Sequence, residues 1–243
     1  MRSLWLIAVL CLAMQARAQE ELTAEQLLDR SIAFHDPDGK WEDSKMTLVV
    51  DMEMPNRPVR SSQIIINNEK GTFELSMVNR GRYLQWKVDG LDSCEVKVDF
   101  REPTTAQADS LGLNSDRARR WRNYYSYLYG LPMKLKDEGT NIMEGVTSTT
   151  FEGKDVLAIK VMYDEAVGSD TWYFYFHPST YAMVGYRFYH DESKNDGEYI
   201  VLEGMSIQKG LRIPKDRAWY TNGDKRLLGT DMLVSMDVEI YYK

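Results

Sequence analysis

The chain has 243 residues, of which 43% are hydrophobic, and its formal net charge at pH 7 is -7. This length suits a domain with a full hydrophobic core. The acidic balance excludes a general nucleic-acid binder, because such proteins neutralise phosphates with a surplus of lysine and arginine.

The first residues have the pattern of a secretory signal peptide. The segment MRSLWLIAVLCLAMQARAQ contains a basic Arg2, an apolar run from Leu4 to Met14, and the small-x-small sequence Ala16-Arg17-Ala18 that signal peptidase accepts. We expect cleavage after residue 18, which leaves a periplasmic chain of residues 19–243, with an extracellular location as the alternative. No later stretch approaches the roughly 20 apolar residues of a transmembrane helix, so no stable membrane insertion is expected.

Two cysteines occur, and neither predicts a disulfide or a lipid anchor. Cys11 follows Leu10, where a lipoprotein signal needs a small residue, so we expect an unlipidated protein. Loss of the signal removes two arginines, which lowers the formal net charge from -7 to -9 and leaves Cys94 alone. Because Cys94 shares the parity of Val96 and Val98, the pattern predicts a buried small side chain rather than a nucleophile.

The first element after the signal is predicted to be a helix. In LTAEQLLDRSIAFHDPDG, Thr23 and Gln26 have the spacing of a capping box, apolar residues recur at helical intervals, and Pro37 ends the helix. From there to about residue 100, apolar residues occupy every second position, as at Leu84 and Trp86. Such alternation predicts an antiparallel meander with one face in water.

The alternation stops at Pro103. Residues 104–135 predict a helical insertion whose clearest part, NSDRARRWRNYYSYLYGLPMKL, begins at a cap on Asn114 or Ser115 and ends near Gly130. Strands return after it, and we expect about eleven in all. The apolar face of so long a meander must be covered, either by a second sheet or by helices around which the sheet curls. Two helices favour the second solution, so the predicted fold class is α+β: an antiparallel curled sheet, or half-open β-barrel, of about eleven strands with an N-terminal helix and a mid-chain helical lid.

Catalytic and metal-binding motifs are missing from the sequence. It lacks a G-x-S-x-G elbow, an H-E-x-x-H pair, a P-loop and a C-x-x-C pair. His35 is interpreted as a helix C-terminal cation beside turn residues. A metal site formed with Asp36 and Asp38 would need the three side chains to point to one place, which the sequence alone does not show. His177 and His190 lie in polar turns and are expected to be solvated. We therefore expect no enzymatic activity, no metal and no cofactor; chance pairs of carboxylates leave an unrecognised hydrolase as an alternative.

Aromatic side chains concentrate in DTWYFYFHPSTYAMVGYRFYHDE, residues 170–192, which predicts a β-hairpin. Trp172, Phe174 and Phe176 share one face, and Tyr186 and Phe188 of the returning strand join it, so this face is expected to point into the concavity. The tyrosines of opposite parity point outward, namely Tyr173, Tyr175, Tyr181 and Tyr189. A core face with a half-wet tyrosine face explains the strands alone. The alternative is a carbohydrate-binding module that uses exposed Tyr173, Tyr175 and Tyr189 for stacking.

The inserted helix carries a second aromatic surface. Trp121, Tyr125 and Leu128 recur at helical spacing, and Tyr124 widens the surface. The first half of the helix holds four arginines: Arg117, Arg119, Arg120 and Arg122. In an acidic protein these either pair with strand carboxylates or meet an anionic ligand head group at the mouth of a cavity. The residues alone favour neither role.

The order of the elements and one segment resemble the LolA/LolB lipoprotein-carrier superfamily. The segment is YFYFHPSTYAMVGYRFYHDESKNDGEYIVLEGMSIQKGLRIPK, in which Pro178, Thr180, Ile213 and Pro214 fit the family pattern and His177 stands where the family usually has aspartate. More narrowly, the chain is similar to secreted relatives from Gram-negative bacteria that carry HDP and YGLPMKL segments. The resemblance implies a half-open barrel closed by a helical lid, as a single domain over residues 19–243.

That resemblance also implies a non-catalytic carrier or sensor that holds a lipid-like or acylated ligand in the concavity. The implied ligand-binding residues are Trp121, Tyr124, Tyr125, Leu128, Trp172, Phe174, Phe176, Tyr186 and Phe188, with Arg120 and Arg122 at a head group. The expected partners are the hydrophobic or acylated ligand and, as a further candidate, another envelope protein. The chain is expected to be a monomer.

Overall fold

The computed structural model describes residues 22–90 and 93–241, so the predicted signal peptide over residues 1–18 lies outside the described residues. The elements in chain order are α1 (Ala24–His35), β1 (Ser44–Glu53), β2 (Arg60–Asn67), β3 (Thr72–Asn79), β4 (Arg82–Asp89), β5 (Ser93–Val98), α2 (Thr105–Leu111), α3 (Ser115–Gly130), the 3-10 turn η1 (Met133–Lys136), β6 (Thr140–Ile142), β7 (Thr147–Phe151), β8 (Lys154–Tyr163), β9 (Thr171–Phe176), β10 (Met183–Tyr189), the 3-10 turn η2 (Glu192–Lys194), β11 (Glu198–Gln208), β12 (Leu211–Thr221) and β13 (Leu227–Ile240).

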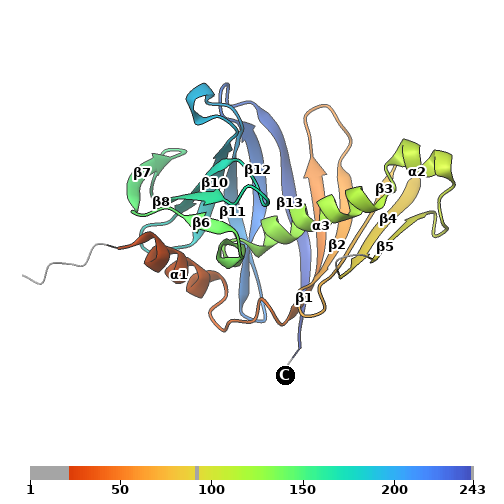
Figure 1. Ribbon diagram of the computed structural model, residues 1–243, viewed down its shortest axis with the longest axis horizontal. Helices are drawn as coiled ribbons and strands as arrows, with labels where there is room; N and C mark the ends of the chain where they lie inside the picture. The colour runs from red at the N-terminus through yellow and green to blue at the C-terminus, as the bar shows by residue number, and fades with distance from the viewer. Residues whose placement is uncertain (1–21, 91–92, 242–243) are drawn as a thin grey trace, which may run out of the picture.

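The strands form one open, curled antiparallel sheet (Figure 1). Its order is β5-β4-β3-β2-β1-β13-β12-β11-β10-β9-β8-β6, and β7 pairs with a second stretch of β8. The predicted α+β class is therefore confirmed, but the sheet has 13 strands instead of about eleven. The sequence pattern missed β6, which has only 3 residues, and β7, whose sequence TSTTF has no alternating apolar residues.

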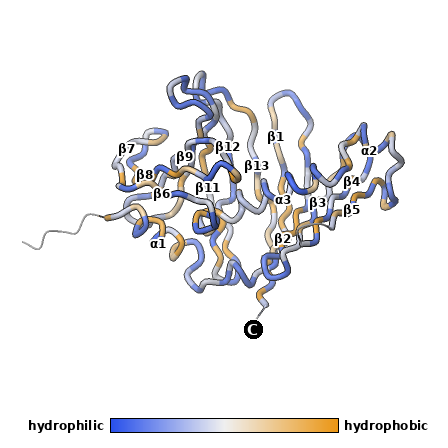
Figure 2. Tube along the Cα trace, viewed as in Figure 1, coloured by the Kyte–Doolittle hydropathy of each residue, from blue (hydrophilic) through white to orange (hydrophobic). Residues whose placement is uncertain are grey.

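The alternation along the strands decides which side of the sheet becomes the core. In β1, Met46, Leu48 and Val50 are buried, whereas Lys45 and Thr47 between them are partly exposed. Hydrophobic and hydrophilic residues are interspersed along β3 to β5 (Figure 2), and in β2 the buried Ile64 and Ile66 flank the half-buried Ile65. Cys94 in β5 is half-buried, so it is less enclosed than its parity predicted. The predicted meander with one wet face is confirmed, and its apolar side faces the helices.

The helices begin at the side chains that the sequence indicated. Thr23 and Gln26 form the reciprocal capping box of α1, and Asn114 caps α3 by accepting a hydrogen bond from the backbone N–H of Arg117 at 2.9 Å. The insertion is divided, because α2 ends at Gly112, a residue in the left-handed conformation at φ 65°, before α3 starts. Figure 1 shows α3 lying across the strands. Its buried side chains, among them Tyr125, Leu128 and Tyr129, join the core.

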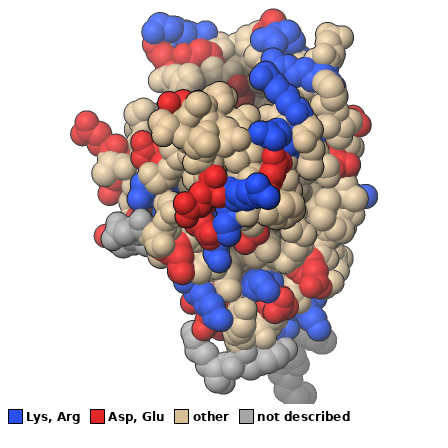
Figure 3. All heavy atoms as spheres, turned by 90° about the vertical axis from the view of Figure 1, so that its right-hand side faces the viewer, with Lys and Arg blue, Asp and Glu red and all other residues tan. Residues whose placement is uncertain are grey.

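The outer surface is charged and mixed. Acidic and basic side chains are interspersed on the side of the molecule formed by β5 and α2 (Figure 3), as is typical of a face in contact with water. Among the described residues, no helix is both long and apolar enough to cross a membrane.

The structure corrects the interpretation of His35 as a helix C-terminal cation. The ring is fully buried between α1 and the sheet. Nδ1 donates to the carbonyl oxygen of Arg212 at 2.6 Å, and Nε2 accepts the backbone N–H of Met183 at 3.0 Å. This arrangement needs the neutral ring, and burial, with the nearby charges of Arg212 and Arg217, lowers the pKa of His35 from 6.5 to about 4. Both ring nitrogens thus form hydrogen bonds with the backbone.

We expect His35 to make folding stability depend on pH. Its folded pKa lies below its unfolded pKa, so its contribution is complete above pH 6.5 and is lost as the pH falls toward about 4. The loss amounts to roughly 3 kcal/mol, at about 1.4 kcal/mol per pKa unit. Urea unfolding at several pH values measures this dependence, and it should be reduced in His35→Gln. His177→Gln is the matched control at an exposed histidine. A His35 titration by NMR with a pKa at or above 6.5 would contradict the account.

Candidate functional site: an aromatic hollow beside α3

Side chains from β9, β10 and β11 form parallel rows on the inner face of the sheet. Directly paired residues of antiparallel strands point to the same face. One row contains Trp172, Phe188 and Glu198, and the next row contains Phe174, Tyr186 and Ile200. The predicted common face of Trp172, Phe174, Tyr186 and Phe188 is therefore present. The second row is fully buried, whereas the residues of the first row are only partly buried.

A hollow of about 1050 Å³ lies beside α3 and reaches the first of these rows. Six aromatic residues line it at this end: Tyr124, Tyr127, Tyr163, Trp172, Phe188 and Trp219. Elsewhere its wall includes Trp41, Ile66, Asn67, Leu128 and Arg122. A concave, largely apolar wall with a few polar groups is the usual form of a small-molecule site.

Trp172 is the centre of the aromatic wall. Its ring centroid lies 4.8 Å from that of Phe188, 5.8 Å from Tyr127 and 6.5 Å from Tyr163, with interplanar angles of 30°, 66° and 85°. The rings consequently present faces and edges in several directions. The hydroxyl groups of Tyr127 and Tyr163 are hydrogen-bonded to each other. Burial raises the pKa of Tyr163 to about 12 and also raises the pKa of Tyr127. Both hydroxyl groups therefore stay neutral.

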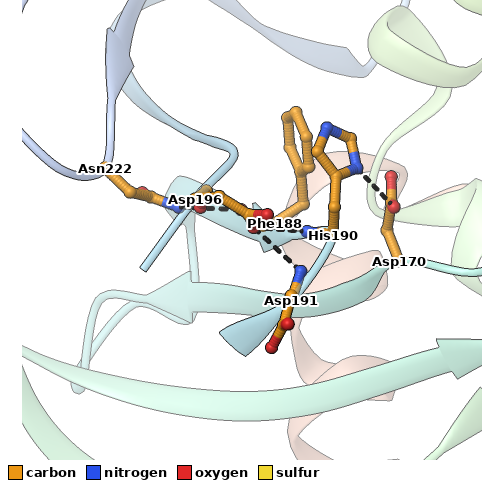
Figure 4. Close-up of polar contacts among 6 residues, drawn as sticks. All are labelled: Asp170, Phe188, His190, Asp191, Asp196 and Asn222. Carbon is orange, nitrogen blue, oxygen red and sulfur yellow. Dashed lines mark hydrogen bonds and ion pairs between the residues drawn. The ribbon is translucent and has the colours of Figure 1, made fainter. Parts of the chain in front are cut away.

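Carboxylates stand at the same end of the hollow. Asp170 and Glu198 both line it, and Nδ1 of His190 lies 2.7 Å from Oδ1 of Asp170 (Figure 4). The Asp170 carboxylate raises the pKa of His190. Burial raises the pKa of Glu198, with the charge of His190 acting in the opposite direction. This end therefore combines aromatic rings with an acidic rim.

The turn that carries His190 is fixed by its own hydrogen bonds. Oδ1 of Asp196 accepts the backbone N–H groups of His190 at 2.9 Å and of Asp191 at 2.8 Å (Figure 4). Nδ2 of Asn222, from the turn after β12, donates to the carbonyl oxygens of Phe188 and Asp196. The His190 ring then lies 5.4 Å from that of Phe188, centroid to centroid. The rim is thus built against the aromatic wall.

The predicted site residues divide between the hollow and the core. Five line the hollow: Tyr124, Leu128, Trp172, Phe188 and Arg122. Tyr125, Phe174, Phe176 and Tyr186 are at most 1% exposed and belong to the core beneath α3. Trp121 is partly buried and stacks on Tyr125, and Arg120 is exposed. Sequence parity identified the inner face, but not which residues on it are covered by α3.

Three of the four arginines of α3 have contacts that neither sequence-based role included. The guanidinium of Arg117 lies 5.7 Å from the Trp121 ring centroid, and Arg119 pairs with Asp116 of the same helix at 3.6 Å. Arg122 lines the hollow, where its Nη1 donates to the carbonyl oxygen of Gly90 at 2.9 Å in the β4–β5 turn. Arg122 thus binds a backbone oxygen on the half of the sheet away from Trp172.

Sequence reasoning missed several residues of the wall. Trp219 faces inward because it pairs with Ile200 across β11 and β12, and Glu198 does so because it pairs with Phe188. Parity within each strand was visible in the sequence, but the register between strands was not. Tyr163 and Asp170 flank the β8–β9 connection and come to the hollow through the curl of the sheet.

The outward tyrosines do not form the predicted stacking platform. Tyr175 is 7% exposed, because the ring of Phe151 from β7 stacks on it at 4.2 Å. Gly185 permits this cover, since a Cβ there would clash with Phe151 and would lie 2.7 Å from the carbonyl oxygen of Ile200. The hydroxyl of Tyr173 donates to Glu192, and its ring is edge-on to Tyr189. The prediction that Tyr175 is exposed is wrong.

Comparisons with known proteins agree with this architecture. A family model described as a family of unknown function (DUF6503) matches residues 4–236, and no curated protein matches the chain in sequence. A LolA superfamily protein from Nitrosomonas europaea aligns with a TM-score of 0.52 at 9% identity, over 90% of this chain and 95% of that one. An outer membrane lipoprotein-sorting protein domain from Vibrio parahaemolyticus aligns with a TM-score of 0.45 at 12% identity, over 90% and 94% of the two chains. The chain has a LolA-like fold and belongs to the DUF6503 family.

Proposed function

We propose that this protein is a non-catalytic periplasmic carrier or sensor that binds a lipid-like or acylated ligand in the hollow beside α3. The observation that carries the proposal is the set of six aromatic residues that line the hollow while remaining only partly buried. Partly exposed rings on a concave wall retain apolar surface that a ligand can cover. The hollow volume of about 1050 Å³ is at the upper end of the range for small-molecule sites.

The fold supports the same proposal independently of the individual residues. A LolA-like sheet curls around a helix and leaves space between the two, and the resemblance to lipoprotein carriers implies acyl chains in that space. The signal pattern of residues 1–18 supports a periplasmic location. The proposal includes a partner in the envelope that delivers the ligand to this protein or receives the ligand from it.

A series of single-chain amphiphiles with one head group and increasing acyl length tests the proposal. Each added methylene that enters the hollow contributes about 0.8 kcal/mol, so we expect the affinity to rise about fourfold per methylene until the hollow is full. Isothermal titration calorimetry below the micellar concentration measures the series, and saturation near one ligand per protein is expected. Affinity that is independent of chain length would contradict an apolar binding site.

A further inference from the structure

We propose that the aromatic end of the hollow recognises a positively charged alkylammonium group on the ligand. This inference rests on the proposed function and extends it to the chemistry of the ligand's polar end. A cation held over aromatic faces is attracted by the negative charge density of the rings, most strongly by tryptophan. Recognition of ammonium groups by several rings at once is the best-known use of this interaction.

The rings that line this end of the hollow differ in orientation. Trp172 is nearly perpendicular to Tyr163, at 85°, and inclined by 66° to Tyr127, so the three rings form walls rather than a stack. Phe188 continues the wall across β10, 4.8 Å from Trp172. All four residues line the hollow and remain partly exposed. Their neighbours in the next row, Phe174 and Tyr186, are 0% exposed and offer nothing to a ligand.

The carboxylates supply the matching charge. Glu198 is the direct cross-strand neighbour of Phe188 and lines the hollow with Asp170. Asp170 is paired with His190. Two further carboxylates line the hollow: Asp137, which is already paired with Lys134, and Glu42, which is exposed. Glu198 has no such ion pair among the described residues, and burial opposes its ionisation. A ligand cation beside it would compensate the buried charge.

The basic residues of α3 do not favour an anionic head group at this end. Arg122 donates to the carbonyl oxygen of Gly90 in the β4–β5 turn, on the half of the sheet away from Trp172. Arg120 is exposed and does not line the hollow. An anion beside Trp172 would meet the carboxylate of Glu198, which has no ion pair among the described residues, whereas the charge of Asp170 is paired with His190. Like charges at such distances repel, and they do so more strongly where water is excluded. The charge at this end therefore selects against an anion.

The test compares ligands with one chain and different head groups. Dodecyltrimethylammonium, dodecyl maltoside and dodecyl sulfate are titrated below their micellar concentrations, with circular dichroism to verify that the protein stays folded. We expect dodecyltrimethylammonium to bind at least about tenfold more tightly than dodecyl sulfate, from cation–π and charge contributions together. Tetramethylammonium is added as a competitor. Competition indicates that a small free quaternary ammonium ion is sufficient for binding. Absence of competition indicates that the cation must belong to an amphiphile. Both results require that dodecyltrimethylammonium is the preferred amphiphile.

Two variants test the named groups. Glu198→Gln should weaken binding of dodecyltrimethylammonium about tenfold and leave binding of dodecyl maltoside within twofold. Glu203→Gln, at an exposed carboxylate of the same strand, is the matched control and should change neither. Trp172→Phe keeps an apolar ring but weakens cation binding selectively.

The outcomes separate this inference from the proposed function. Equal affinity for the three head groups, or an unchanged preference in Glu198→Gln, would overturn the alkylammonium inference and leave the apolar site intact. Preference for dodecyl sulfate would also overturn it. Failure of all three amphiphiles to bind would refute both the inference and the proposed function.

Discussion

Arg217→Met is expected to lower the free energy of unfolding by about 3–5 kcal/mol, the usual cost of leaving a buried opposite charge uncompensated. Arg217 is 1% exposed and is the direct cross-strand partner of Asp231, which is also 1% exposed. The guanidinium donates to the carbonyl oxygens of Pro214 at 2.9 Å and of Leu128 in α3 at 3.3 Å. It also lies 4.0 Å from the ring centroid of Tyr129. One side chain therefore joins the sheet to α3 and lies near a buried carboxylate whose charge it partly compensates.

The dependence of this effect on pH identifies its cause. Burial raises the pKa of Asp231 while the charges of Arg217 and Arg60 oppose the rise, so removing Arg217 raises that pKa further. A carboxyl whose folded pKa is above its unfolded pKa costs stability as the pH rises through that interval. The destabilisation in Arg217→Met should hence be larger at neutral pH than in acid.

Urea unfolding with a double-mutant cycle measures the effect. Arg217→Met with Asp231→Leu should recover much of the loss, because both buried charges are then absent. Arg226→Met, at an exposed arginine in the turn after β12, is the control and should change stability by less than about 0.5 kcal/mol. A loss of less than about 1 kcal/mol in Arg217→Met, equal at all pH values, would refute the role given to the pair.

Replacing both Trp172 and Phe188 by leucine is expected to weaken binding of an acyl ligand by about 2 kcal/mol or more, roughly thirtyfold. The two rings are in contact and form the centre of the exposed aromatic wall. Leucine keeps the positions apolar, so the loss reports the ring surface rather than a change of polarity. Displacement of a fluorescent acyl probe with an uncharged head group measures the affinity.

Phe174→Leu is the matched control for this double variant. Phe174 lies on the same strand and the same face as Trp172, but it is 0% exposed beneath α3 and does not line the hollow. We expect it to lose about 1–2 kcal/mol of stability by the usual cost of core truncation and to keep its ligand affinity. Equal loss of affinity in both proteins would show that binding responds to general destabilisation and not to the wall.

The sequence predicted the elements better than their contacts. Period-two alternation identified the meander and the inner parity of Trp172 and Phe188, and the capping residues Thr23 and Asn114 placed two helix starts. These signals are local, because each depends on neighbouring residues of one segment. The short β6 and the threonine-rich β7 have no such signal.

The rest of the site depends on register and on where α3 crosses the sheet. Phe174 and Trp172 have the same parity, yet one is covered by the helix and the other lines the hollow. The positions of Glu198 and Trp219 follow from cross-strand pairs that no single strand encodes. The burial of His35 is a tertiary effect of the same kind, since its ring nitrogens bond to β12 and to the start of β10.

The most direct test of ligand carriage is mass spectrometry of an organic extract from the protein purified out of its native cells, from the periplasmic fraction in which the proposal places it. An unrelated periplasmic protein purified in the same way is the control, and the variant with leucine at Trp172 and Phe188 is measured in parallel. The account predicts an acyl lipid or acylated peptide near one molecule per protein, enriched over the control and depleted in the variant. Ligand carriage would be contradicted if the extract contained no more lipid than that of the unrelated control and the native protein also bound no added amphiphile.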